Sequence, residues 1–204
     1  MQQLTSHPPL ILTFASLEHL DLQMNALTST IPTEMGLLTN LEFLGMAFNN
    51  LNGTLPSEIA LLSNLWEMTV WMNQLTGTIP EEIYLTNYTA LNNLVFGYNY
   101  FTGTISTLIG QLSTIGYMYF PSLQLEGTIP TEIGLLSNLA KIHFDHNTNL
   151  TGSIPMELCA LRGTFLTVIN ADCDVTSSGK APMECAPGCC TKCCNQETGT
   201  CEKV

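Results

Sequence analysis

A unit of about 24 residues recurs along this chain, and the repetition constrains the fold more than any other feature of the sequence. Successive units begin at steps of 24, 24, 26, 24 and 24 residues. Their first residues are Leu17, Leu41, Leu65, Leu91, Ile115 and Leu139. The stretch LEFLGMAFNNLNGTLPSEIALLSN, residues 41–64, shows the pattern L-x-x-L-x-L-x-x-N-x-L-x-G-x-I-P-x-E-I-x-x-L. A fixed period of this length predicts a solenoid, in which each unit forms one coil and packs on its neighbours.

The apolar spacing within each unit is that of a leucine-rich repeat. The L-x-x-L-x-L segment predicts a short strand whose leucines point inward while the residues between them point outward. The glycine permits a turn with positive φ, and the following proline starts a short helix or 3₁₀ turn. The predicted fold is therefore an α/β, right-handed leucine-rich repeat solenoid. Its parallel sheet is concave, its convex side carries short helices or 3₁₀ turns, and a disulfide-rich cap closes its C-terminal end.

An asparagine stands nine residues along in most units. The column consists of Asn25, Asn49, Asn73, Asn99 and Asn147. A buried amide can satisfy the backbone groups left unpaired where each coil bends, so the column is interpreted as structural. The fifth unit has Leu123 at this position and Pro121 at the exit of its strand. Leucine cannot make the amide hydrogen bonds, so we expect this coil to be locally irregular.

Two further columns accompany the turn. Glutamates follow the proline position in five units, at Glu34, Glu58, Glu82, Glu132 and Glu157. Carboxylates at helix N-termini are favoured by ~0.3–1 kcal/mol each, so we expect helix stabilisation, with an acidic docking ridge as the alternative. Hydroxyls precede the isoleucine position at Thr30, Thr54, Thr78, Thr104, Thr128 and Ser153. They predict a second short strand in each coil, with an ice-binding array as the alternative.

Three segments are predicted along the chain. Residues 17–164 hold six repeats, and residues 165–204 form a cysteine-rich cap. Residues 1–16 are expected to be part of an earlier repeat, because 8–14 align with 32–38 in the second half of a unit. The start Met1-Gln2-Gln3 lacks the cationic character of a secretory signal. We therefore expect a signal and an N-terminal cap to lie upstream of this chain.

The charge balance is strongly acidic. The chain has 5 Lys and Arg against 17 Asp and Glu, a net charge of −12. Nucleic-acid binding is disfavoured, because cationic side chains supply most of that affinity. Anionic membrane surfaces are disfavoured for the same reason. No apolar run approaches the ~20 residues needed to span a bilayer.

Seven of the eight cysteines lie after position 170. They are Cys159, Cys173, Cys185, Cys189, Cys190, Cys193, Cys194 and Cys201. Such crowding suggests an oxidising compartment and a stapled cap. A bridge between Cys159 and Cys173 would tie the last coil to the cap, although eight cysteines allow 105 pairings. A zinc site at Cys190-x-x-Cys193 is the alternative.

Glycosylation sequons agree with a secretory route. Three are present, at Asn52, Asn87 and Asn149. Together with the cysteines, they predict an extracellular or cell-surface location.

Motifs of catalysis are scarce. The sequence contains no Gly-rich phosphate loop, no G-x-S-x-G elbow and no H-E-x-x-H. One polar cluster on the sixth strand contains Lys141, His143, Asp145 and His146. We interpret this cluster as a polar rim, with a copper or zinc site as the alternative. We expect neither an enzyme nor a cofactor.

The outward strand positions carry an aromatic band over the middle four coils. Its residues are Phe43, Phe48, Trp71, Met72, Tyr98, Tyr117 and Tyr119. Exposed contiguous aromatic side chains usually mark a binding surface. Packing of some rings over neighbouring coils is the alternative.

The ending L-x-G-x-I-P, whole in 75–80 and 125–130, resembles the plant-type class of leucine-rich repeats found in receptor-kinase ectodomains and polygalacturonase inhibitors. The similarity covers roughly residues 17–164. The tail, with Cys159, Cys173, Cys185 and the run Cys189-Cys190-Thr191-Lys192-Cys193-Cys194, resembles that of extracellular leucine-rich repeat proteins of diatoms. The resemblance implies a non-enzymatic extracellular module that binds a protein or peptide on its concave face, as the ectodomain of a receptor-like protein. A glycan-binding, cell-wall-binding or polygalacturonase-inhibitor-like protein is the alternative.

Overall fold

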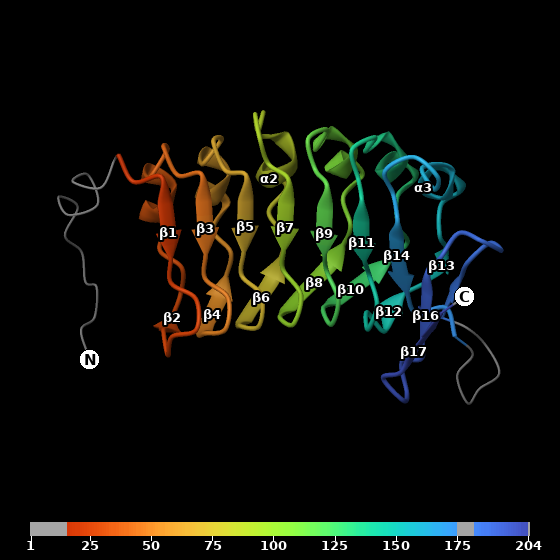
Figure 1. Ribbon diagram of the computed structural model, residues 1–204. Coiled ribbons are helices and arrows are strands. Elements are labelled where there is room, and N and C mark those ends of the chain that lie inside the picture. The colour runs from red at the N-terminus through yellow and green to blue at the C-terminus, as the bar shows by residue number, and fades with distance from the viewer. Residues whose placement is uncertain (1–15, 175–181, 204) are drawn as a thin grey trace.

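The chain winds as a solenoid with one strand of a long sheet in each coil (Figure 1). The computed structural model describes residues 16–174 and 182–203, so nearly all of the predicted partial repeat over 1–16 lies outside the described residues. The concave sheet runs in the order β1 (His19–Asp21), β3 (Phe43–Gly45), β5 (Glu67–Thr69), β7 (Asn93–Val95), β9 (Tyr117–Tyr119), β11 (Lys141–His143), β14 (Val168–Ala171), β16 (Lys192–Cys194) and β17 (Cys201–Lys203). Neighbouring strands are parallel except for β16 and β17, which are antiparallel. The sheet therefore continues from the repeats into the cap.

A second sheet confirms the predicted second strand. Its members are β2 (Thr28–Ser29), β4 (Asn50–Thr54), β6 (Gln74–Thr78), β8 (Tyr100–Thr104), β10 (Gln124–Gly127) and β12 (Asn149–Leu150). A separate pair joins β13 (Gly152–Ser153) to β15 (Met183–Glu184) in the cap. Gly77 has a φ of +77°, and an added Cβ would lie 2.9 Å from the methyl group of Thr54 in the preceding coil. The glycine is thus required by both its backbone conformation and the close approach of the coils.

Short helical turns line the convex side, as predicted (Figure 1). They are the 3₁₀ helices η1 (Thr33–Leu37), η2 (Ser57–Leu61), η3 (Thr107–Gln111) and η4 (Thr131–Leu135), and the α-helices α2 (Glu82–Leu85) and α3 (Met156–Ala160). The five glutamates of the predicted column each lie in the first turn of one of these helices. Among the described residues, no helix combines the length and hydrophobicity needed to cross a membrane.

The third coil is built differently on this side. Its Tyr84 stands where η1, η3 and η4 have glycine and η2 has Ala60. Tyr88 takes the core position that a leucine fills in the other repeats, and both tyrosines are buried. Burial raises the pKa of the Tyr88 phenol to about 12. The two additional residues of this unit therefore accommodate two large rings.

The asparagine column forms a hydrogen-bonded ladder, as predicted. Asn73 donates to the carbonyls of Met46 in the preceding coil and Val70 in its own, at 2.9 and 3.0 Å. Its Oδ1 accepts from the backbone N–H of Leu51 at 3.0 Å. Asn49, Asn99 and Asn147 are also buried and bridge coils in the same way. Asn25 is exposed and contacts only its own coil, because no described coil precedes it.

The expectation of an irregular fifth coil is wrong for its concave strand. Strand β9 keeps its register with both β7 and β11. Leu123 is buried in the apolar core, which replaces part of the lost hydrogen bonding by packing. The carbonyls of Phe96 and Phe120 each still accept from one amide, of Asn99 and Asn147.

Restoring the ladder should still stabilise this coil. We expect Leu123→Asn to raise the free energy of unfolding by ~1 kcal/mol, the usual net value of a satisfied hydrogen bond. Urea denaturation of the variant and of wild type measures the difference. A fall in stability would show that the buried leucine contributes more than the amide.

Four disulfides staple the cap and use all eight cysteines. The pairs are Cys159–Cys189, Cys173–Cys193, Cys185–Cys190 and Cys194–Cys201. The expected bridge between Cys159 and Cys173 is wrong, because each cysteine lies nearer to a different part of the tail. Cys190 and Cys193 are both oxidised in these pairs, so the thiolates that a zinc site requires are not present.

Candidate binding surface

The register of the concave sheet aligns outward-facing residues into rows that cross the coils. One row contains His19, Phe43, Glu67, Asn93, Tyr117, Lys141 and Val168. The next contains Asp21, Gly45, Thr69, Val95, Tyr119, His143, Asn170 and Lys192. A ligand lying across the coils would therefore meet one residue from each coil in turn.

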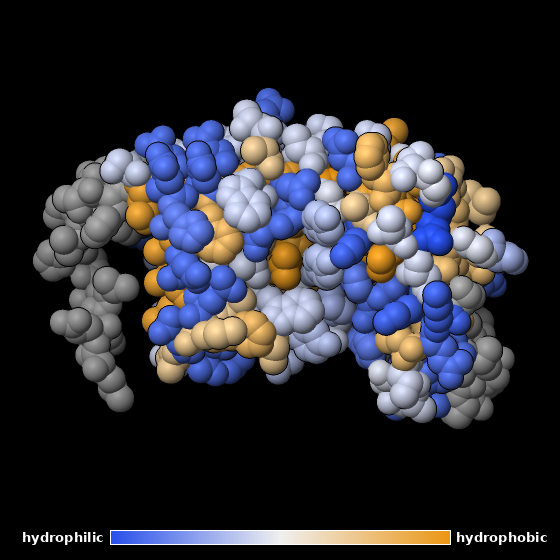
Figure 2. Space-filling model, viewed as in Figure 1, coloured by the Kyte–Doolittle hydropathy of each residue, from blue (hydrophilic) through white to orange (hydrophobic). Residues whose placement is uncertain are grey.

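A further row, which we call the rim row, lies just beyond the strands where each coil turns. It contains Met24, Phe48, Met72, Tyr98, Ser122 and His146, and all six have φ between 52° and 60°. This left-handed conformation costs residues other than glycine roughly 1–2 kcal/mol. The exposed fractions of Met24, Phe48, Met72 and Tyr98 are nevertheless 78%, 42%, 43% and 45%. Figure 2 shows a hydrophobic patch below the strands of the first coils.

Trp71 joins the rim row to the sheet. Its ring lies 4.6 Å from that of Tyr98 in an edge-to-face arrangement. It also covers Gly97, where an added Cβ would come within 2.8 Å of the indole. Trp71 is therefore half-buried, with one part packed on the next coil and the rest accessible.

Phe43 is buried instead of exposed, with 8% of its surface accessible. It stacks on His19 at a centroid distance of 4.2 Å and contacts Trp66 at 5.7 Å. Trp66 itself is 41% exposed and was missed by the sequence analysis. The available signal was a tryptophan directly before the strand, where Glu18 and Glu42 stand in the first two coils.

The last two aromatic residues of the predicted band lie next to the polar end of the sheet. Tyr117 and Tyr119 are half-buried and stack at 6.5 Å. Tyr119 also stacks on His143 at 4.7 Å, and the Lys141 ammonium lies 5.6 Å from the centre of the Tyr117 ring. Burial raises the pKa of Tyr119. The aromatic residues of the concave face are thus in direct contact with the basic side chains of the next coil.

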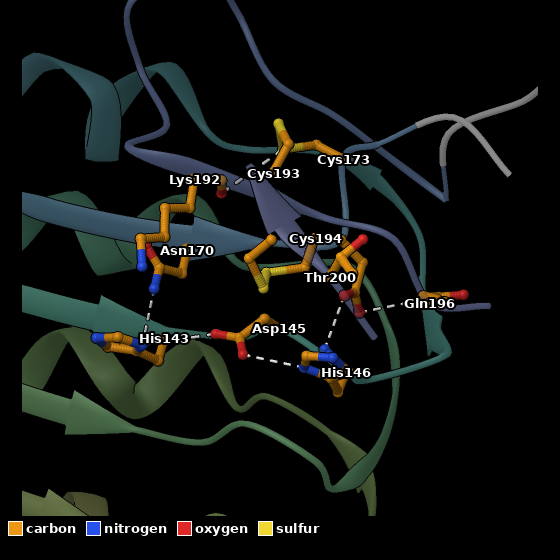
Figure 3. The surroundings of a disulfide bond; sticks show 12 residues. His143, Asp145, His146, Asn170, Cys173, Lys192, Cys193, Cys194, Gln196 and Thr200 are labelled. Carbon is orange, nitrogen blue, oxygen red and sulfur yellow. Dashed lines mark hydrogen bonds and ion pairs between the residues drawn. A yellow bond between two sulfur atoms is a disulfide. The ribbon is translucent and has the colours of Figure 1, made fainter. Parts of the chain in front are cut away.

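The histidine cluster forms a hydrogen-bonded network at the junction with the cap (Figure 3). Asp145 lies between His143 and His146, at 3.5 and 3.1 Å from their Nδ1 atoms. Burial opposes ionisation of Asp145, but the two histidines outweigh it and lower the pKa of this carboxyl. The Asp172 carboxylate accepts from the backbone N–H of His146 and of Asn147, at 2.7 and 2.8 Å.

The main role of this network is to hold parts of the fold together. Gln196 from the tail donates to Asp172 at 3.0 Å, so the network fastens the tail to the sixth coil. Burial raises the pKa of Asp172, against the effect of these hydrogen bonds. Among the described residues, ligand atoms converge in Cys173–Cys185–Cys190 and in Asp145–Cys194–Cys201, and both sets contain disulfide cysteines. The histidine cluster does not form such a convergent group.

The predicted glycosylation sites lie away from the concave sheet. Asn52 is in β4 and Asn149 in β12, while Asn87 follows α2 on the convex side. All three side chains are exposed. Glycosylation at these positions stays a prediction and would leave the concave rows open.

Comparisons with known proteins agree with this geometry. The family model described as Leucine Rich Repeat matches residues 16–38 and 40–62. The plant peptide hormone receptor RGFR1 in complex with RGF2 is 34% identical over 78% of this chain and 25% of that one, with a TM-score of 0.72. The PEPR1–AtPEP1 structure is 27% identical over 77% of this chain and 21% of that one, also with a TM-score of 0.72. No curated protein matches.

A bacterial structure has a similar fold. The leucine-rich repeat protein LIC12759 of Leptospira interrogans is 32% identical over 69% of this chain and 33% of that one, with a TM-score of 0.56. The chain spans about a quarter of the length of the plant receptors it matches, 25% and 21%. The similarity of the tail to diatom proteins stays a prediction. The repeats, the coil geometry and these neighbours together show that the chain is a leucine-rich repeat solenoid similar to the ectodomains of plant receptors.

Proposed function

We propose that this solenoid is a non-enzymatic, extracellular recognition module that binds an extended peptide across its concave face. The observation that carries the proposal is the rim row. Phe48, Met72 and Tyr98 hold large apolar side chains in a left-handed conformation at the surface. Folding alone favours glycine or asparagine there, so selection for contact with a partner explains these residues better than selection for stability.

The surrounding surface supports the same function. Trp71 and Tyr119 project from coils two apart, roughly 10 Å at one strand spacing per coil. Together with the rim row they line a stretch long enough for several residues of an extended peptide. Two receptors of similar fold support this proposal: RGFR1, a plant peptide hormone receptor, in complex with RGF2, and HAESA in complex with the peptide hormone IDA. The four disulfides favour an oxidising, extracellular location, and a receptor-like ectodomain is the role we propose.

Truncation of Trp71 tests the proposed site. Large aromatic anchors often contribute ~2 kcal/mol or more to an interface. We expect Trp71→Ala to weaken binding at least ~10-fold, a change of ~1.4 kcal/mol. The ligand is a peptide selected from a random display library on the immobilised protein, and calorimetric titration measures its affinity.

The control for this titration is Glu82→Ala on the convex side, which should bind like wild type. A glycan array run in parallel tests the glycan-binding alternative. Unchanged peptide affinity in Trp71→Ala, with the fold intact by circular dichroism, would remove the concave aromatic surface as the site.

The rim row makes a second, sharper prediction. Met72→Asn should raise the free energy of unfolding by ~0.5–1 kcal/mol, because asparagine tolerates the left-handed conformation better than methionine. The same variant should weaken peptide binding. Denaturation and titration of one protein sample measure both effects. Loss of stability in Met72→Asn would show that the methionine is retained for packing.

A further inference from the structure

Cationic side chains are rare in this chain, and their distribution is uneven. Residues 16–140 contain no lysine or arginine, although ten acidic residues lie there. Three of the basic residues, Lys141, Lys192 and Lys203, lie in β11, β16 and β17 at the C-terminal end of the concave sheet. Arg162 lies elsewhere, after α3, where its guanidinium donates to the carbonyl of Thr167 at 2.8 Å.

Strand register places the three lysines on one face. Lys192 pairs with Asn170, which pairs with His143, so Lys192 belongs to the concave row that also contains Tyr119. Figure 3 shows the Lys192 side chain beside Asn170, on the same side of the sheet as His143. Lys203 lies directly opposite Lys192 in the antiparallel pair of β16 and β17. Directly opposed residues of a sheet project from the same face.

Like charges directly opposite each other destabilise a strand pair. No carboxylate in the described ranges lies within ion-pair distance of Lys141, Lys192 or Lys203, since the ion pairs found there join histidines to Asp145. Asp145 and Asp172 are nearby but buried and hydrogen-bonded. Glu202 pairs with Cys193 and so projects from the other face. In the described part of the chain, the three lysines thus form a patch of positive charge that no carboxylate neutralises by an ion pair.

The opposite end of the concave face has the opposite sign. Glu18, Asp21, Glu42 and Glu67 lie on or beside β1, β3 and β5, and no lysine or arginine occurs in this part of the sequence. The aromatic residues lie between the two ends. A peptide crossing the coils would therefore experience a field with a defined direction, which selects its orientation.

The geometry points to a basic subsite formed by Lys141, Lys192 and Lys203, in which the tail contributes directly to ligand recognition. Its ligand is a run of aspartate or glutamate side chains in an extended peptide, whose apolar part lies over the aromatic rows. The inference rests on the proposed function, because it assumes that a peptide crosses the concave face. It adds the charge pattern of the ligand and its direction along the solenoid.

Short fluorescein-labelled peptides serve as probes. The aspartate peptide has a run of aspartates followed by alternating aromatic and serine residues. In the asparagine peptide, asparagines replace the aspartates. In the lysine peptide, lysines replace them. Fluorescence anisotropy near physiological salt, where the Debye length is ~8 Å, restricts the effect to nearby charges. We expect the aspartate peptide to bind about tenfold more tightly than the asparagine peptide, and the lysine peptide to bind more weakly than both.

Matched variants locate the effect. Lys192→Gln combined with Lys203→Gln should abolish the preference for aspartate over asparagine. Gln111→Glu combined with Ser137→Glu, at exposed convex positions, changes the net charge by the same amount and should leave the preference unchanged. Equal affinity for the aspartate and asparagine peptides, or an equal effect of the two double variants, would overturn the basic subsite.

Trp71→Ala separates this inference from the proposed function. If this variant weakens binding of the asparagine peptide, and the aspartate peptide binds no more tightly than the asparagine peptide, the concave aromatic site stands and the basic subsite fails. If aspartates still bind through the lysines while Trp71→Ala has no effect, the subsite stands and the aromatic site fails.

Discussion

Replacing Cys159 and Cys189 together by alanine is expected to lower the free energy of unfolding by ~3.5 kcal/mol. The two residues are 30 apart in sequence, and their disulfide joins α3 of the last repeat to the buried Cys189 of the cap. Removing the cross-link restores the conformational freedom of the unfolded chain between them. The tail should then separate from the solenoid and expose the core under Ile169 and Met183. Urea denaturation and hydrogen exchange measure the two effects.

The control for the Cys159–Cys189 prediction is the pair Cys185 and Cys190, which are 5 apart in sequence. The same chain-entropy relation assigns this shorter loop ~2 kcal/mol, so its removal should cost distinctly less. Thiol titration of the wild-type protein should find no reactive cysteine. Equal destabilisation by both pairs, or stoichiometric zinc in the purified protein, would contradict this description of the cap.

Gly134→Val is expected to destabilise the protein by about 3 kcal/mol, at the upper end of the range for overpacking. Gly134 lies in η4, and a Cβ built on it would collide with the Cβ of Glu157 and lie 2.8 Å from the Glu157 carbonyl carbon. Glu157 belongs to α3 in the next coil, so the added group meets backbone and not a mobile side chain. The coils would have to separate, which weakens both sheets at that point.

Hydrogen exchange can localise the effect of Gly134→Val, because each coil of a solenoid contacts mainly its neighbours. Faster exchange should appear in β11 and β14 before it appears in β3. Gln111→Val, at an exposed position of η3, should change stability by no more than ~0.5 kcal/mol. An equally mild effect of Gly134→Val would mean that the coils tolerate a wider spacing.

The repeating positions were predictable because each recurs in the same local environment. The asparagine ladder, the convex helices and the second strand follow from a single unit stacked on itself, and all three are present. Leu123 shows the limit of this reasoning. Its missing hydrogen bonds were visible in the sequence, but the packing that preserves the coil involves residues of neighbouring repeats.

The candidate site was less predictable than the fold. Alternation along a strand identifies which side chains point outward, but exposure also depends on what the neighbouring coils place beside them. Gly45 leaves space that Phe43 fills, and Gly97 leaves space that Trp71 fills. Trp66 is exposed because it precedes its strand, outside the alternation.

The solenoid, the direction of its leucines and the position of its cap follow from the amino-acid pattern alone, because stacking of the coils buries every repeated apolar position in the same way. The pairing of the cysteines, the accessibility of the aromatic rings and the clustering of the lysines depend on the three-dimensional arrangement of the coils and the cap. Cys173 and Cys193, and likewise Lys192 and Lys203, are brought together by the pairing of β14, β16 and β17. The cap has no repeat, so its strand register depends on contacts between distant residues, and the spacing along the chain does not specify them.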